Sequence, residues 1–229
     1  RSAPHALTPP LTPIKGQIHT LQNRTTAPEQ PQPRQFVTVL DPNFQRLYSH
    51  VQDLLDSTRL QGDRLPVKPQ PADLADLVRD VAESFNPAAE EAGITLMSEV
   101  PATLPCQADL PRMAQALSNL MVNALKFTPS GGTVQLRAQR EAGNIRIEIK
   151  DSGVGMEPDQ IKRLFQPFEQ VHESQTAEHQ GSGLGLYITR GIVEMHGGKV
   201  WAESAGPNQG SSFIILMTEA GPGRKQEAS

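Results

Sequence analysis

Cysteine and aromatic residues are scarce in this sequence of 229 residues, which has one cysteine, Cys106, and 4% Phe, Trp and Tyr. A single cysteine excludes an internal disulfide and any zinc site built from several cysteines. The six histidines show no spacing typical of a metal site. We therefore expect no structural metal, and we expect Cys106 to be a small, half-buried residue that packs and does not react.

Long apolar runs and a strong net charge are also missing. No apolar run approaches the ~20 residues that a membrane-spanning helix needs, and the N-terminus lacks the basic and then apolar pattern of a signal peptide. The formal net charge is −4, which provides no positive field for nucleic acid. We expect a cytoplasmic fragment without nucleic-acid or membrane contact, from a larger parent protein that can itself be anchored in a membrane.

The length permits two modules, and the first sixty residues have the pattern of two helices. In two segments the apolar residues recur at steps of three and four, as in helices packed in a bundle. These positions are Leu7, Leu11, Ile14, Ile18 and Leu21 in the first segment and Phe44, Leu47, Val51, Leu54 and Thr58 in the second. A proline- and glutamine-rich loop over residues 25–35 separates them. We predict an antiparallel helical hairpin over residues 1–62, with Asp41 capping the second helix.

A hairpin this thin buries only one side of each apolar seam. Burying the other side requires a second copy, so we predict a homodimer in which two hairpins form a four-helix bundle. The alternative is that the seams pack against the rest of this chain.

The second module reads as a compact α/β unit over residues 63–220, followed by a flexible tail over 221–229. Gly and Pro residues over 61–71 mark the boundary between the modules. Apolar periodicity predicts helices over 73–85, 109–125 and 184–196, and strands over 94–99, 133–140, 144–150, 199–203 and 211–217. The fold class is therefore α+β.

Asn119, Asn123 and Lys126 stand out in the segment "NLMVNALKF". The two asparagines are four residues apart, hence on one face of a helix. An amide oxygen is a suitable ligand for Mg²⁺, which usually also takes phosphate oxygens and water. A solvated helix face is the alternative interpretation of these three residues.

Two glycine-rich turns complete the pattern. In "DSGVG", the carboxylate of Asp151 can accept a hydrogen bond from an exocyclic amine such as that of adenine, and Gly153 and Gly155 allow close approach of the backbone. "GSGLGL" opens onto a helix, where backbone N–H groups form a site suited to phosphates. Ordinary tight turns would explain either segment alone. The polar run between them, up to Gln180, is expected to be a mobile lid.

Together and in this order, these segments resemble the motifs of the sensor histidine kinases. Asn119–Phe127 is similar to the N box, Asp151–Gly155 to the first glycine box, Phe165–Phe168 to the F box, and Gly181–Leu186 to the second glycine box. The resemblance covers nearly the whole chain. It implies a dimerising hairpin that carries the phosphorylated histidine, followed by an α/β sandwich of the histidine kinase/heat-shock chaperone ATPase type.

The resemblance also implies ATP and Mg²⁺ as cofactors. Asn123 would ligate Mg²⁺, Asn119 would take part in catalysis by arranging the triphosphate, and Lys126 would touch phosphate. Asp151 would bind the amino group of adenine, and Phe127 would line the adenine pocket. The remaining nucleotide-binding residues implied in this way are Gly153, Gly155, Gly181, Gly183, Leu184, Gly185 and Ser212.

The first residues resemble the family's histidine box, with His5 as the phosphate acceptor. Ala6 stands where the family has an acid that serves as general base, and such help is typically worth roughly 10²–10⁴-fold. Pro9 stands where a Thr or Asn supports dephosphorylation of the partner, a response regulator. We therefore expect autophosphorylation of His5 slowed by about that order, and weak or absent phosphatase activity.

Three prolines near His5 also oppose a continuous helix, because a proline inside a helix removes a backbone donor. We expect the helix to begin with Thr8 as its cap and His5 to lie on a flexible lead-in. Two functions from different classes follow. One is a protein histidine kinase that passes phosphate to a receiver-domain aspartate, and the other is a degenerate, non-catalytic dimeric signalling platform. A third class, the chaperone-type ATPases, is disfavoured because the N box has no carboxylate to activate water.

Overall fold

The computed structural model describes residues 51–60, 67–169 and 182–221. His5 and its neighbours, the first predicted helix and most of the second, and the predicted lid over 170–180 lie outside the described residues, as does the tail beyond Gly221. The predictions made for these segments, and the domain boundaries at 62 and 63, stay predictions.

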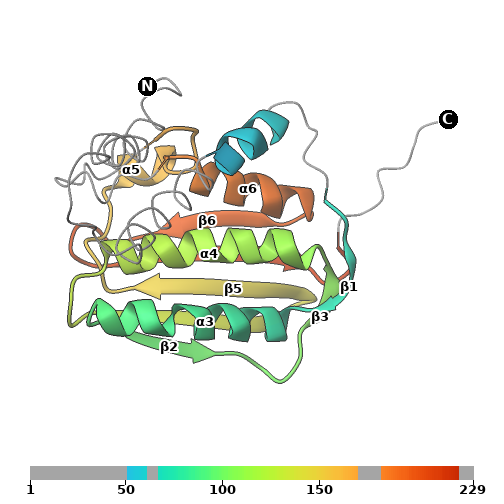
Figure 1. Cartoon of the computed structure of the whole chain (residues 1–229), viewed down its shortest axis with the longest axis horizontal. Helices are drawn as coiled ribbons and strands as arrows, with labels where there is room; N and C mark the ends of the chain where they lie inside the picture. The colour runs from blue at the N-terminus through green and yellow to red at the C-terminus, as the bar shows by residue number, and fades with distance from the viewer. Residues whose placement is uncertain (1–50, 61–66, 170–181, 222–229) are drawn as a thin grey trace, which may run out of the picture.

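A five-stranded sheet forms one layer of the molecule (Figure 1). Its strands, in spatial order, are β2 (Thr95–Glu99), β4 (Thr133–Glu141), β5 (Asn144–Asp151), β7 (Ser211–Thr218) and β6 (Lys199–Glu203). β2 runs parallel to β4, and the other neighbours are antiparallel. Strands β4 and β5 are joined by Ala142 and Gly143 with φ of 48° and 79°, the left-handed pair that a tight hairpin turn requires.

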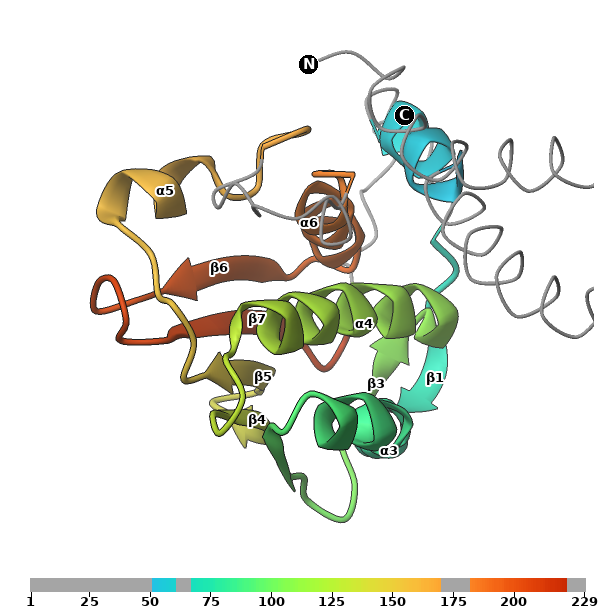
Figure 2. The same cartoon turned by 60° about the vertical axis from the view of Figure 1, so that its left-hand side comes forward.

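Three helices cover one face of this sheet, as the edge-on view in Figure 2 shows. They are α3 (Leu74–Glu91), α4 (Leu110–Phe127) and α6 (Gly185–Met195). The side chains that face them alternate along the strands, for example Val134, Leu136 and Ala138 on β4, and all three are buried. The predicted α+β sandwich is confirmed, and the strand alternation in the sequence is the reason that it could be predicted.

Polar side chains fix the starts and ends of these helices. The Asp109 carboxylate accepts from the Arg112 N–H at 3.2 Å and so caps α4. His196, which is 0% exposed, joins the end of α6 to the same cap. Its Nε2 accepts from the Asp109 N–H at 2.9 Å, so its Nδ1 carries the proton and donates to the Ile192 carbonyl at 2.8 Å. The neutral imidazole therefore locks α4 and α6 together.

Several elements differ from the sequence prediction. Helix α3 continues to Glu91 through Pro87, beyond the predicted end at Phe85. Two short strands, β1 (Gln70–Asp73) and β3 (Pro105–Ala108), form a separate antiparallel sheet, although β1 begins in the segment predicted as a linker. A short helix, α5 (Pro158–Arg163), lies before the F box. These elements have four to six residues or contain proline, so periodicity alone did not reveal them.

Residues 51–60 form a helix that lies beside α6 (Figures 1 and 2). It coincides with the last part of the predicted second hairpin helix. Within the described residues, no helix has the length and apolar character needed to cross a membrane. Cys106, expected to be half-buried, is buried, and burial raises the pKa of its thiol to about 11, so the thiol is protonated at neutral pH.

Candidate functional site

The N box and the second glycine box are in direct contact. Helix α4 carries Asn119, and its amide Nδ2 donates to the Gly185 carbonyl at 3.1 Å, at the first residue of α6. The Thr189 hydroxyl donates to the same carbonyl at 2.9 Å. A Cβ on Gly185 would lie only 3.5 Å from the Asn119 Cγ. The two motifs, 66 residues apart in the chain, therefore belong to one site.

The glycine turn before α6 is shaped by its neighbours. The Ser182 hydroxyl accepts from the Leu184 N–H at 3.2 Å, and Gly183 adopts φ +70°. A Cβ on Gly183 would come within 2.9 Å of the Phe168 carbonyl carbon, and the Phe168 N–H donates to the Gly183 carbonyl at 3.0 Å. The F box is thus pinned to the second glycine box, and glycine is required here both by φ and by the close approach.

Asp151 lies at the end of β5 with its side chain on the helix-covered face, 6% exposed. Its Oδ1 accepts from the Gly153 N–H at 2.8 Å and from the Ser211 N–H at 3.1 Å. Burial raises the pKa of this carboxyl, while the two N–H donors oppose the rise. Within the described residues, both hydrogen bonds to this carboxylate are accepted by Oδ1, and Oδ2 takes no part in them.

The first glycine box also has a packing role. A Cβ on Gly153 would lie 2.3 Å from the Phe127 carbonyl oxygen, and one on Gly155 would lie 2.1 Å from the Gly206 carbonyl oxygen. The Val154 N–H donates to the Phe127 carbonyl at 3.1 Å. These two glycines therefore let the turn fit between the end of α4 and the 206–210 turn. Glycine is needed at both positions for this packing, whereas the sequence alone indicated close approach of a ligand.

Lys126 and Phe127 lie at the end of α4. The Lys126 Nζ lies 4.8 Å from the centroid of the Phe127 ring, within the range of a cation–π contact. Burial lowers the pKa of this ammonium. Asn123 is half-buried one turn before Lys126, on the same helix as Asn119. An amide oxygen and a cation thus accompany Asn119 along α4.

Not every predicted residue joins this cluster. Ser212 follows Ser211 on β7 and points to the opposite face of the sheet, where it hydrogen-bonds Glu148 and helps lower the pKa of that carboxyl. Its neighbour Ser211 is the one that contacts Asp151, through its N–H. Leu184 is 1% exposed and packs in the core. Gly181 and His5 lie outside the described residues.

Comparison with known proteins agrees with this geometry. Residues 108–220 match the family described as histidine kinase-, DNA gyrase B-, and HSP90-like ATPase. The chain contains a histidine kinase catalytic ATP-binding domain. The circadian input-output histidine kinase CikA of Synechococcus elongatus is 31% identical over 218 residues, which cover 94% of this chain and 29% of that protein.

Solved structures of histidine kinases share the fold. The Acinetobacter baumannii histidine kinase AdeS superposes with a TM-score of 0.72 at 21% identity, over 94% of this chain and 98% of that one. Full-length ShkA in complex with AMPPNP gives a TM-score of 0.70 at 29% identity, over 96% of this chain and 45% of that one. The chain spans 25% to 41% of the length of the first four curated relatives.

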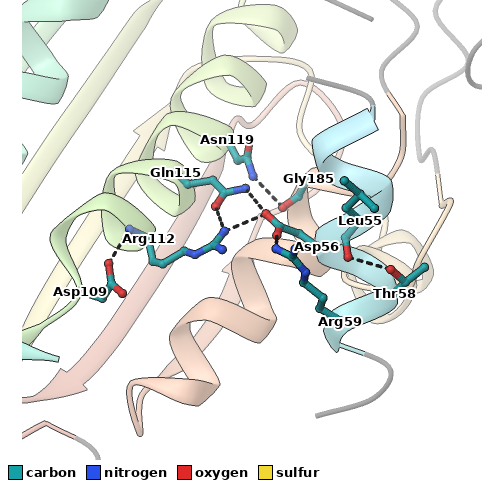
Figure 3. Close-up of polar contacts among 9 residues, drawn as sticks. All are labelled: Leu55, Asp56, Thr58, Arg59, Asp109, Arg112, Gln115, Asn119 and Gly185. Atoms are coloured by element: carbon teal, nitrogen blue, oxygen red, sulfur yellow. Dashed lines mark hydrogen bonds and ion pairs between the residues drawn. The ribbon is translucent and has the colours of Figure 1, made fainter. Parts of the chain in front are cut away.

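The histidine kinase catalytic domain also contacts the helical segment 51–60. Sequence reasoning predicted this helix, and packing of its seam on the rest of the chain as an alternative, but it did not identify the polar contacts with α4. In Figure 3, Asp56 of this segment faces Arg112 and Gln115 of α4. The Arg112 Nη1–H donates to the Asp56 Oδ2 at 2.8 Å, and the Gln115 Nε2–H donates to it at 3.0 Å. A signal was present, because residues 112, 115 and 119 recur at helical spacing on the face that carries the N box.

Proposed function

We propose that this chain is the kinase region of a two-component sensor, which phosphorylates its own His5 with ATP and passes the phosphate to an aspartate of a response regulator. The observation that carries the proposal is the hydrogen bond of Asn119 to Gly185, which joins the N box to the glycine turn. Support comes from relatives named as histidine kinases and from the ATP analogue AMPPNP in the ShkA complex.

The adenine end of the nucleotide would meet Asp151. Its Oδ2 is suited to accept from the adenine amino group, and Phe127 nearby would provide an apolar wall. The buried setting of the Asp151 carboxylate strengthens such a hydrogen bond, because little water competes for it. This part of the site would distinguish adenine from guanine, which has a carbonyl oxygen in place of the amino group.

The phosphate end would lie over the glycine turn and α4. The residues fit Mg²⁺, since this ion keeps several waters, binds phosphate oxygens and needs only one or two protein oxygens, here from Asn123. Bound Mg²⁺ would neutralise phosphate charge. Asn119 would orient the triphosphate, and Lys126 would contact a phosphate oxygen. The backbone N–H groups at the start of α6 would complete the phosphate site.

In the reaction itself, an imidazole nitrogen of His5 would attack the γ-phosphorus of ATP, and the bond from that phosphorus to the bridging oxygen of ADP would break. The other imidazole nitrogen must lose its proton. Ala6 has no group to accept this proton, so water would take it and the rate would be lower by about the 10²–10⁴ that a general base contributes.

The residues of the histidine box favour a second candidate function. Ala6 and Pro9 replace two residues that the family uses for chemistry, so the chain would act as a dimeric signalling platform that binds ATP without transfer. In both cases we propose a homodimer through the hairpin, a response regulator as partner, a cytoplasmic location, and no contact of this segment with membrane or nucleic acid.

Incubation with γ-labelled ATP and Mg²⁺ separates the two functions. The kinase proposal predicts acid-labile label on the wild-type chain and none on His5→Gln. Nucleotide binding without any label would support the platform. Equal labelling of His5→Gln would contradict His5 as the acceptor.

A further inference from the structure

The helical segment 51–60 is held on the catalytic domain by a buried ion pair. The Asp56 side chain is only 4% exposed, and Arg112 pairs with it at 2.8 Å (Figure 3). Gln115 donates to the same carboxylate oxygen, and Arg59 approaches the other oxygen at 3.7 Å. A carboxylate this buried needs hydrogen-bond and charge partners to offset its lost hydration, so these contacts favour one docked position.

Apolar packing reinforces the same position. Leu60 lies against Gly191 of α6, where an added Cβ would come within 2.3 Å of the Leu60 Cδ2. Leu54 and Leu60 both pack against the core of the domain. Leu60 can pack this closely only because Gly191 has no side chain. A larger residue at position 191 would therefore push segment 51–60 away from α6 without changing any charge.

The docked segment also reaches the glycine turn. The Ser182 hydroxyl donates to the Asp53 Oδ2 at 2.9 Å, while accepting from the Leu184 N–H. Asp53 therefore brings a carboxylate within one hydrogen bond of the turn whose N–H groups would meet phosphates. Two anions at one turn repel each other, and the repulsion is strongest where water is partly excluded.

We propose that docking of residues 51–60 is an autoinhibitory contact, in which Asp53 opposes nucleotide binding at the 182–185 turn. The inference rests on the proposed nucleotide site. Because coupling between two binding events is reciprocal, nucleotide must also weaken the docking of the segment. The state of the hairpin and the occupancy of the ATP site would then control one another.

The direct test is the affinity of the full chain for AMPPNP with Mg²⁺, measured by calorimetry. Asp53→Asn keeps an acceptor for the Ser182 hydroxyl and removes the charge, so we expect binding about five-fold or more tighter, as for typical couplings. Asp76→Asn is the matched control, because Asp76 lies on α3 with its side chain 72% exposed and the change in net charge is the same. We expect the affinity of this control to equal that of the wild type.

Gly191→Val provides an independent, uncharged way to undock the segment. It should tighten AMPPNP binding as well, and Asp53→Asn should then add nothing in the Gly191→Val background. As a second readout, AMPPNP should speed hydrogen exchange of the amides in residues 51–60.

The possible failures are distinguishable. Good binding by the wild type with no change in Asp53→Asn, or added protection of residues 51–60 by AMPPNP, would overturn the autoinhibitory contact and leave the proposed function standing. No binding by any well-folded variant would overturn both.

Discussion

Replacing Asp151 with Asn separates the structural role of this side chain from its proposed contact with adenine. Asn retains one oxygen, which can accept from the Gly153 and Ser211 N–H groups that now bind Oδ1 at 2.8 and 3.1 Å. The amide NH₂ then takes the place of Oδ2 and faces the adenine amino group. If the amide turned around, two buried backbone donors would lose their acceptor, which costs about 1–3 kcal/mol each.

The expected loss of ATP affinity follows from this geometry. A hydrogen bond to a charged group contributes about 1.5–3 kcal/mol, and about 1.4 kcal/mol corresponds to a factor of ten. Asp151→Asn should therefore bind ATP roughly 10- to 150-fold more weakly. GTP has a carbonyl oxygen at the corresponding position and can accept from the new NH₂, so the preference for ATP over GTP should shrink or reverse.

Folding stability should respond differently. Burial raises the pKa of Asp151 above 3.8, so the folded state binds this proton more tightly than the unfolded chain. That contribution to stability is complete below pH 3.8 and is lost as the pH rises through the raised folded pKa. Asp151→Asn is neutral at every pH. At pH 7 its free energy of unfolding should equal that of the wild type to within about 1 kcal/mol or be larger. As the pH falls, the free energy of unfolding of the wild type should rise relative to that of the variant.

Calorimetric titration with ATP and GTP, together with urea unfolding at several pH values, measures both effects. Asp151→Ala serves as the control that loses the acceptor and should be destabilised as well as weak in binding. Unchanged ATP affinity in a folded Asp151→Asn variant, or equal losses for ATP and GTP, would refute the assignment of Asp151 to adenine.

Three further predictions concern other parts of the molecule. His196→Ala leaves the buried Asp109 N–H without an acceptor and opens a cavity, so urea unfolding should show a loss of about 2–4 kcal/mol; a loss below about 1 kcal/mol would contradict the locking role. Arg112→Met removes the main partner of the buried Asp56 carboxylate, so hydrogen exchange in residues 51–60 should rise by at least ten-fold while the core of the sheet is unaffected; equal rates would contradict the ion pair. Asn123→Ala should weaken AMPPNP binding in the presence of Mg²⁺ much more than in EDTA, and equal losses in both would argue against a Mg²⁺ ligand.

Much of the fold could be predicted because one face of its strands is buried against the helices and the other is more exposed. Alternation along β4 and β5 identified two strands to within one residue of their ends, and apolar periodicity with the capping Asp109 identified α4. The small sheet of β1 and β3 could not be found in this way. Its strands have four residues each and contain Pro71 or Pro105. The composition around β1 therefore indicated a linker, although pairing with a strand distant in the sequence determines the structure there.

The site shows a similar division. The sequence indicated Asn119, Asp151 and the second glycine turn because each belongs to a motif with its own spacing. It placed Ser212 with them, but strand register turns that side chain to the opposite face and leaves the contact to the Ser211 backbone. The Asp56–Arg112 pair joins residues 56 positions apart, and nothing local in either segment specifies such a partner.

A crystal structure of the chain with AMPPNP and Mg²⁺ tests the central claim most directly. The account predicts adenine with its amino group within hydrogen-bond distance of the Asp151 Oδ2, the metal ion on the Asn123 side-chain oxygen, and phosphates over the turn that ends at Gly185. Nucleotide bound elsewhere would contradict it. So would a structure obtained at a saturating concentration of AMPPNP in which no nucleotide lies on this face of α4.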